Sequence, residues 1–150
     1  MSNFLDFIPA EVTLAGTQTL TNKTISGASN TLTVDGTNAV GFRNIPQNSQ
    51  STAYTLVLDD AGKHIFHPSA DTTARTFTIP ANSSVAYPIG TAITFINQNA
   101  AGAVTIAITS DTMRLSPAGT TGSRTLAANG SATCVKVTST EWLISGSGLT

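Results

Sequence analysis

The sequence has little charge, one cysteine and no long apolar run, and each shortage excludes a class of function. Charged residues make up 10% of the 150 residues, and the formal net charge is −1. Binding a nucleic-acid backbone requires a basic surface, so we expect no nucleic acid as a partner. The single cysteine cannot form an intramolecular disulfide. The sequence has no run of 18 apolar residues that could span a membrane, so we expect no membrane as a partner.

Threonine and serine supply most of the polar side chains, with 26 and 15 residues. Threonine favours extended backbone, and this composition is the opposite of a helical enzyme rich in glutamate and lysine. A chain of 150 residues can bury one modest core. We therefore predict an all-β protein with one ordinary domain and a short appendage.

Residues 1–10 form an apolar peptide in which Pro9 ends any helix. Burying its four large apolar side chains would supply roughly 6–12 kcal/mol before ordering costs, at about 1.5–3 kcal/mol each. Because Asp6 interrupts the apolar run and no basic region precedes it, we do not interpret it as a signal peptide. We predict a docking peptide, or alternatively packing on its own subunit. The docking residues are Phe4, Leu5, Phe7 and Ile8.

Residues 11–50 are β-prone but too polar to form a core within one chain. Their low apolar content leaves an ordering entropy of about 1–2 kcal/mol per residue uncompensated unless identical chains share their apolar sides. We therefore predict an extended, intertwined stalk in a homo-oligomer; the alternative is a flexible linker. The side chains expected to face the partner chains are Leu20, Ile25, Leu32 and Val34.

From residue 51 onward the pattern changes to short strands separated by Gly, Pro and Asn, after a polar hinge at 47–52. Such spacing is typical of an antiparallel β-sandwich or jelly-roll-like domain, which we predict for 51–150. Trp142 is its expected core anchor, and Cys134 is expected to be buried. Three hairpins are predicted: 54–58 with 63–67, 92–96 with 104–108, and 132–137 with 142–144.

The stretch Leu20-Thr21-Asn22-Lys23-Thr24-Ile25 resembles a sequence that recurs in the shafts of bacteriophage tail fibres and in small phage head-fibre and capsid-decoration proteins. The likeness covers roughly 17–34, and the ending 141–150 is similar only in style to the terminal β-domains of such proteins. Those families are usually trimers. The resemblance therefore implies a homotrimer on the virion surface, assembled in the cytoplasm of a bacterial host.

Little in the sequence indicates chemistry, and we expect no enzyme activity, cofactor or metal. His64 and His67 are three positions apart on a predicted strand, so they point to opposite faces and cannot easily chelate one ion. A trimer could still gather one histidine per chain around its axis. Asp59 and Asp60 lie in a predicted turn and are expected to accept backbone N–H groups, with calcium binding as the alternative.

We interpret the chain as a non-enzymatic virion structural protein. The favoured form is a trimeric capsid-decoration or head-fibre protein that binds the major capsid protein or another virion protein and stabilises the shell. The alternative is a tail fibre or receptor-binding tip whose loops, 97–103 and 116–123, contact the host surface. Those loops contain no aromatic residue, which weakens the alternative. A third class, a bacterial surface adhesin or a polysaccharide-degrading enzyme, would need an export signal or an acidic catalytic pair. We find neither in the sequence, so we do not favour this class.

Overall fold

The computed structural model describes residues 44–98 and 100–150, which form nine strands and one short 3-10 turn, η2 (Leu58–Asp60). The prediction of an all-β protein is confirmed for these residues. The strands are β1 (Gln47–Ser49), β2 (Tyr54–Thr55), β3 (His64–His67), β4 (Arg75–Ile79), β5 (Ala92–Asn97), β6 (Val104–Ile108), β7 (Thr112–Leu115), β8 (Arg124–Lys136) and β9 (Glu141–Leu149).

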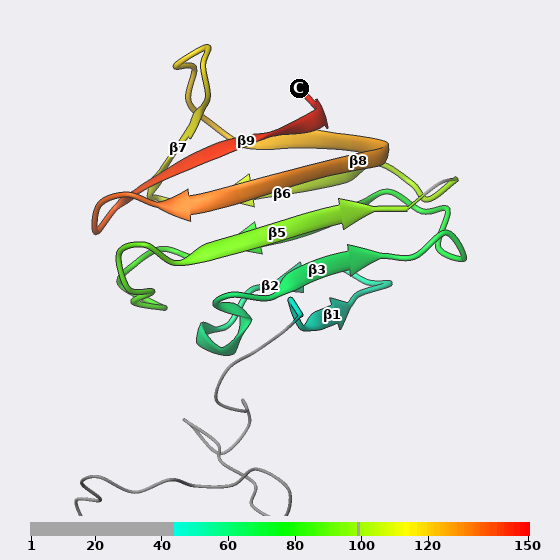
Figure 1. Cartoon of the computed structure of the whole chain (residues 1–150), viewed down its shortest axis with the longest axis horizontal. Helices are drawn as coiled ribbons and strands as arrows, with labels where there is room; N and C mark the ends of the chain where they lie inside the picture. The colour runs from blue at the N-terminus through cyan, green and yellow to red at the C-terminus, as the bar shows by residue number, and fades with distance from the viewer. Residues whose placement is uncertain (1–43, 99) are drawn as a thin grey trace, which may run out of the picture. The chain divides into compact units, whose positions relative to one another are not determined.

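The strands form a single curled sheet with two wings. In the front wing β1, β3 and β5 pair in parallel, and in the back wing β2, β4 and β6 pair in parallel. From β1 to β6, consecutive strands alternate between the front wing and the back wing. Each pair of consecutive strands therefore adds one strand to each wing, and the two wings grow together as a stack. Figure 1 shows the result, with β3 and β5 in front and β6 running in the opposite direction behind β8.

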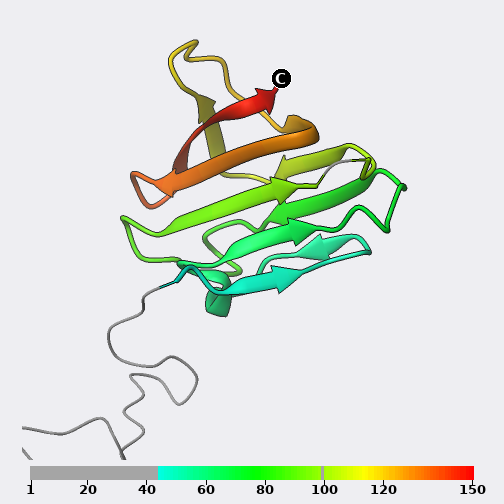
Figure 2. The same cartoon turned by 45° about the vertical axis from the view of Figure 1, so that its right-hand side comes forward.

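The long strand β8 joins the two wings. Its first residues pair antiparallel with β6, and its second half pairs antiparallel with β5 on one side and β9 on the other. Strand β7 then pairs in parallel with β9. Figure 2 shows β8 and β9 lying along the end of the stack opposite β1 and β2. The edge strands β1 and β2 have only three and two residues, and short edges limit pairing with other chains.

Two of the three predicted hairpins are wrong. Strand β2 pairs with β4 while β3 pairs with β1 and β5, and strands β5 and β6 lie in different wings. The turn at 59–62 was correctly placed, but it carries the chain from the back wing to the front wing. The hairpin of β8 and β9 is confirmed. The predicted antiparallel sandwich is therefore replaced by two parallel wings closed by antiparallel strands.

The sheet also begins earlier than the expected boundary at residue 51. Strand β1 pairs with β3 through the register partners Gln47 and His64, Asn48 and Ile65, and Ser49 and Phe66. These residues lie in the segment that the sequence suggested as a polar hinge. Its polarity suits a short edge strand, where one side of the backbone has no strand partner among the described residues.

The core fills the space between the wings and follows the two-residue period of each strand. Inward side chains of the front wing, such as Ile65 and Phe95, are buried in one cluster with Phe77 and Ile106 of the back wing. Trp142 is fully buried there, and so is Cys134, as predicted. Burial raises the pKa of the Cys134 thiol, so its unreactive neutral form is favoured.

Close approach of β8 and β9 depends on Gly146. A Cβ atom at this position would lie 2.2 Å from the backbone oxygen of Ser131 and 2.5 Å from the Cα of Ala132. Because both atoms belong to the paired strand, only glycine permits this register. Among the described residues, no helix has the length and apolar character needed to cross a membrane.

Candidate functional site

The residues predicted to dock and to trimerise lie outside the described residues. They are Phe4, Leu5, Phe7, Ile8, Leu20, Ile25, Leu32 and Val34, all within 1–43. These assignments stay predictions. The described part offers other features: an exposed sheet face, a buried carboxylate at Asp60, an open cavity, and two buried polar clusters at opposite ends of the front wing.

The exposed face consists of the outward side chains of β3, β5, β9 and the second half of β8, and we call it the front outer face. Val135 and Leu143 are register partners that are 36% and 38% exposed, and Ala92 is the next partner in the same row. At the other end of the strands, Phe66 and Ile96 are register partners and partly exposed. A sheet face thus carries two apolar rows without a covering layer in the described chain.

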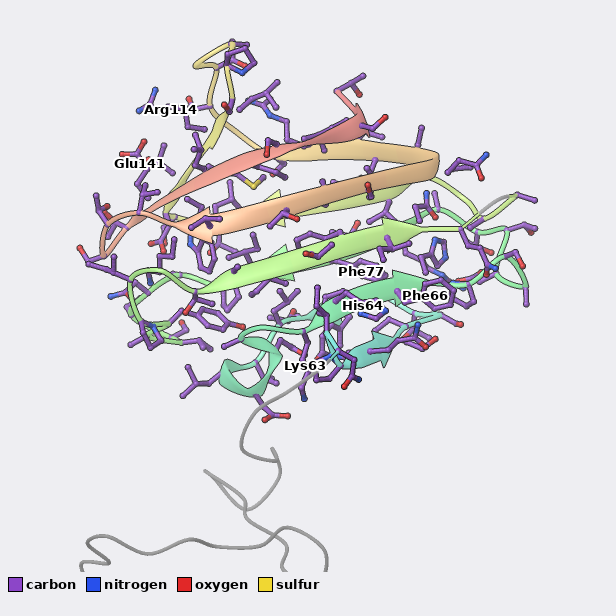
Figure 3. All side chains as sticks on the ribbon, viewed as in Figure 1. Lys63, His64, Phe66, Phe77, Arg114 and Glu141 are labelled. Carbon is purple, nitrogen blue, oxygen red and sulfur yellow. The ribbon has the colours of Figure 1, made fainter. Side chains whose placement is uncertain are left out.

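The row between them is polar and nearly uncharged. It contains His64, Thr94, Thr133 and Ser145, with a hydrogen bond of 3.0 Å between the two threonine hydroxyls. At the edge, Arg114 Nε donates to Glu141 Oε1 at 2.7 Å, so these two charges neutralise each other. Figure 3 shows this pair near β7 and β9, with Phe66 and His64 on β3. Covering this face would therefore desolvate few charges.

At one end of the front wing, His67 is fully buried in a polar cluster. Its Nδ1 lies 3.0 Å from Asn97 Oδ1 and its Nε2 lies 3.1 Å from Asp71 Oδ2. The Asn97 amide is oriented by its Nδ2, which donates to the backbone oxygens of Gly102 and Leu126. Asn97 Oδ1 therefore accepts a hydrogen bond from the Nδ1–H of His67, and Nε2 lies within hydrogen-bond distance of Asp71 Oδ2.

His64, by contrast, lies on the outer side of β3. Its Nδ1 is 3.1 Å from the backbone oxygen of Ile45, and its Nε2 is 3.1 Å from Gln47 Nε2. The prediction that the two histidines point to opposite faces is therefore confirmed. Within residues 44–98 and 100–150, no three His, Cys, Asp or Glu side chains are grouped so that they could hold a metal ion.

The same cluster fixes the carboxylate of Asp71. Arg75 donates to it from Nε at 2.7 Å and from Nη2 at 3.1 Å, and the backbone N–H of Thr73 adds a further bond. The Arg75 hydrogen bonds, helped by His67 and Thr73, hold the pKa of Asp71 well below its ordinary value of 3.8. The cluster ties the loop after β3 to β4 and β5.

Acid should therefore weaken the domain through Asp71. Because the pKa is depressed in the folded state, its stabilisation is fully present above pH 4 or so and is lost as the pH falls toward the folded pKa. We expect the free energy of unfolding of the wild type to decrease below about pH 4. Asp71→Asn should be less stable at neutral pH and should lack this part of the acid dependence.

Urea denaturation between neutral and strongly acidic pH measures this effect. The matched control is Asp59→Asn, since that carboxylate is 51% exposed and forms an ion pair with Lys63 at the surface. The control should keep the acid dependence of the wild type. Equal acid dependence in wild type and Asp71→Asn would contradict the role given to Asp71.

The two adjacent carboxylates at the predicted turn have different environments. Asp60 is 1% exposed and accepts hydrogen bonds from Asn48 Nδ2, the Tyr54 hydroxyl and the backbone N–H of Val57. The expectation that it binds a backbone N–H is confirmed, although most of its partners are side chains. Because both carboxylates have protein partners, the calcium alternative gains no support here.

At the opposite end of the front wing, Lys136 is 1% exposed. Its Nζ donates to Asn82 Oδ1 at 2.6 Å and lies 5.5 Å from the centre of the Trp142 ring. Tyr87 packs edge-on against the same ring at 5.5 Å. Within the described part of the chain Lys136 forms no ion pair. A buried ammonium without a carboxylate partner is costly, so this contact requires an explanation.

An open cavity of about 290 Å³ lies near this end, between the start of β7 and the start of β8. Thr109, Asp111 and Thr112 line one side, and Thr121, Gly122 and Ser123 line the other. Asp111 is its one acidic residue, and its Oδ2 accepts the backbone N–H of Asn82 at 3.1 Å.

Sequence reasoning missed both buried clusters, since Lys136 and His67 looked like ordinary strand residues. One signal was available: the alternation of β8 places Lys136 on the same side as Cys134 and Ala132. A lysine on an apolar side of a strand is unusual enough to merit attention. No protein-family model matches the chain, and no curated protein matches it.

Proposed function

We propose that this chain is a non-enzymatic structural protein of a phage virion. In its favoured form it is a homotrimer that decorates the capsid or forms a short head fibre. Residues 11–50 assemble the trimer through Leu20, Ile25, Leu32 and Val34, and residues 1–10 dock on the shell. The resemblance of 20–25 to phage shaft sequences is the origin of this proposal.

The front outer face is the observation in the described residues that supports it most. Val135 and Leu143 form an apolar row beside a polar row that carries little charge. Exposed apolar rows bordered by polar residues are typical of protein interaction surfaces. We therefore assign this face to contact with a neighbouring virion protein, while the stacked layers of β-strands serve as a rigid support.

Co-sedimentation with empty capsids of the presumed phage tests the proposal. We expect saturable binding of the full chain, and loss of binding when residues 2–10 are removed. Leu143→Lys should weaken binding because it places a charge in the apolar row. The matched control is Thr76→Lys, which places the same charge on an exposed position of β4 in the back wing.

The oligomeric state is measured separately by light scattering. A trimer that depends on Leu20 and Ile25 would support the stalk assignment, and a monomer at all concentrations would overturn it. A full-length trimer that does not bind capsids would overturn the decoration assignment. Binding to host cells by that trimer would instead favour the tail-fibre alternative.

A further inference from the structure

The buried contact between Lys136 and Asn82 has the geometry of two groups that can react. Lys136 Nζ lies 2.6 Å from Asn82 Oδ1. Since a C=O bond is about 1.23 Å long, Asn82 Cγ lies within about 3.8 Å of Nζ. This separation approaches the range of about 3–3.5 Å in which bound reactants are positioned for attack. The two residues are 54 positions apart in the sequence, so the fold itself creates the contact.

We propose that Lys136 and Asn82 form an intramolecular isopeptide bond. The neutral amine of Lys136 attacks Asn82 Cγ, so the Nζ–Cγ bond forms and the Cγ–Nδ2 bond breaks. A proton leaves Nζ and a proton is added to Nδ2, which departs as ammonia. No oxidant, reductant or other reagent is required. The product is an amide, and the buried ammonium disappears with the reaction.

Both reacting residues are held by the surrounding backbone. Lys136 ends β8, where its N–H donates to the oxygen of Thr91 at 2.9 Å and its own oxygen accepts from Gly90 at 2.8 Å. Asn82 lies in a turn after β4, in which Ser84 and Val85 donate to the oxygen of Ala81. Fixed groups lose little entropy on reaching the reactive geometry, which favours a slow reaction without an external enzyme.

A carboxylate is held at the same asparagine. Asp111 Oδ2 accepts the Asn82 backbone N–H at 3.1 Å, and Asp111 also lines the open cavity of about 290 Å³. We assign Asp111 as the group that takes one proton from the Lys136 ammonium and so provides the neutral amine. The proton that Nζ loses on attack is added to Nδ2, which departs as ammonia, and the proton on Asp111 passes to solvent.

The apolar surroundings favour the product over the reactants. Lys136 lies over the Trp142 ring, and the Trp142 Nε1–H is buried without a hydrogen-bond partner among residues 44–98 and 100–150. In such surroundings a neutral amide is less costly than an ammonium with one neutral acceptor. The bond would join the end of β8 to the loop after β4, and so connect the front wing to the back wing covalently.

Intact-mass spectrometry of the full chain under denaturing conditions tests the proposal. Isopeptide formation removes one ammonia, so we expect a mass about 17 Da below that of the sequence. Tandem spectra of a protease digest should contain one branched peptide joining Asn82 to Lys136. A folded wild-type protein with the full sequence mass after prolonged incubation would overturn the proposal, whatever the variants do.

Variants separate this reaction from other losses of ammonia. The pair Asn129 and Gly130 can also lose ammonia by forming a cyclic imide, which Lys136→Met would not prevent. We expect Lys136→Met to restore the full sequence mass and to abolish the branched peptide. A loss of about 17 Da that persists in Lys136→Met, without a branched peptide, would overturn the proposal.

The role of Asp111 has its own readout. Asp111→Asn should retain the fold but form the branched peptide at least tenfold more slowly, and its rate should lose the pH dependence contributed by the carboxylate. Formation at the wild-type rate would overturn the assignment of Asp111 as the proton acceptor. Circular dichroism of each variant shows that the fold is present during the measurement.

Discussion

Replacing Trp142 with alanine should lower the free energy of unfolding by about 3–5 kcal/mol, among the largest losses expected for one residue in this domain. The side chain is fully buried and lies between Met113 of β7 and Lys136 of β8, which are its register partners. It also packs edge-on against Tyr87 at 5.5 Å. Removing it would leave a cavity between β7, β8 and the segment of Tyr87, which cannot easily fill it.

Urea denaturation followed by far-ultraviolet circular dichroism measures this loss. Trp142→Phe is the informative companion, because Trp142 Nε1 has no hydrogen-bond partner to lose in the described part of the chain. We expect it to cost less than about 2 kcal/mol, through packing alone. Leu143→Ala changes the adjacent side chain, which is 38% exposed, and should cost less than about 1 kcal/mol. Similar losses for Trp142→Ala and Leu143→Ala would contradict the assignment of Trp142 as the core anchor.

The sequence was sufficient to predict most of the strands but only one of the three proposed strand pairings, that of β8 with β9. Phe77 and Ile79 alternate with threonines in β4, which predicts a strand with one buried face. Alternation is usually taken as a sign of antiparallel sheets, since parallel sheets are commonly covered on both sides. Here each parallel wing has one exposed side, so its strands have the alternation expected of a sandwich. Periodicity alone could not separate the two arrangements.

The turn at 59–62 illustrates the same limit at the local level. The presence of Asp60 and Gly62 predicted a turn, and the structure has a turn there. Gly62 adopts a φ of 76°, as a glycine in a turn readily does. Whether a turn reverses the chain within a sheet or carries it to another wing depends on contacts distant in sequence. The partner of β2 is β4, and the two are joined by Tyr54 and Phe77 as register partners.

The buried polar clusters were beyond sequence reasoning for a related reason. Lys136 and Asn82 are 54 positions apart, and neither belongs to a recognised motif. The other cluster contains residues that are close together in the sequence, namely His67, Asp71 and Arg75. In an extended chain their spacing does not predict that the three side chains meet. A strand and the loop after it bring them together, with Asn97 of β5 completing the cluster. These contacts depend on which strands pair and in which register, and the amino-acid composition does not determine that pairing.

The second large effect is expected at Asp60. Its carboxylate accepts from Asn48 Nδ2 at 2.7 Å, from the Tyr54 hydroxyl at 2.8 Å and from the Val57 N–H at 2.8 Å. These donors connect β1, β2 and the start of η2. Asp60→Ala would leave all three without an acceptor, at about 1–3 kcal/mol for each one that stays buried. We therefore expect a loss of roughly 3 kcal/mol or more in the free energy of unfolding.

Asp59→Ala is the matched control for this prediction. Asp59 is the adjacent carboxylate, it is 51% exposed, and its partner is Lys63 at the surface. Removing it should cost less than about 1 kcal/mol. Equal losses for the two variants, measured by urea denaturation at neutral pH, would contradict the role of Asp60 in joining the first strands.

A second readout follows from the two tyrosines near Asp60. Burial, followed by the hydrogen bond to Asp60, raises the pKa of Tyr54 above its ordinary value of 10.0. Burial also raises the pKa of Tyr87, with a smaller contribution from the charge of Asp60. Asp60→Asn removes that charge while keeping a side chain of nearly the same shape. Ultraviolet difference spectra should therefore show tyrosine ionisation beginning at a lower pH in the folded variant than in the wild type. An unchanged titration would mean that the Asp60 charge does not act on either ring.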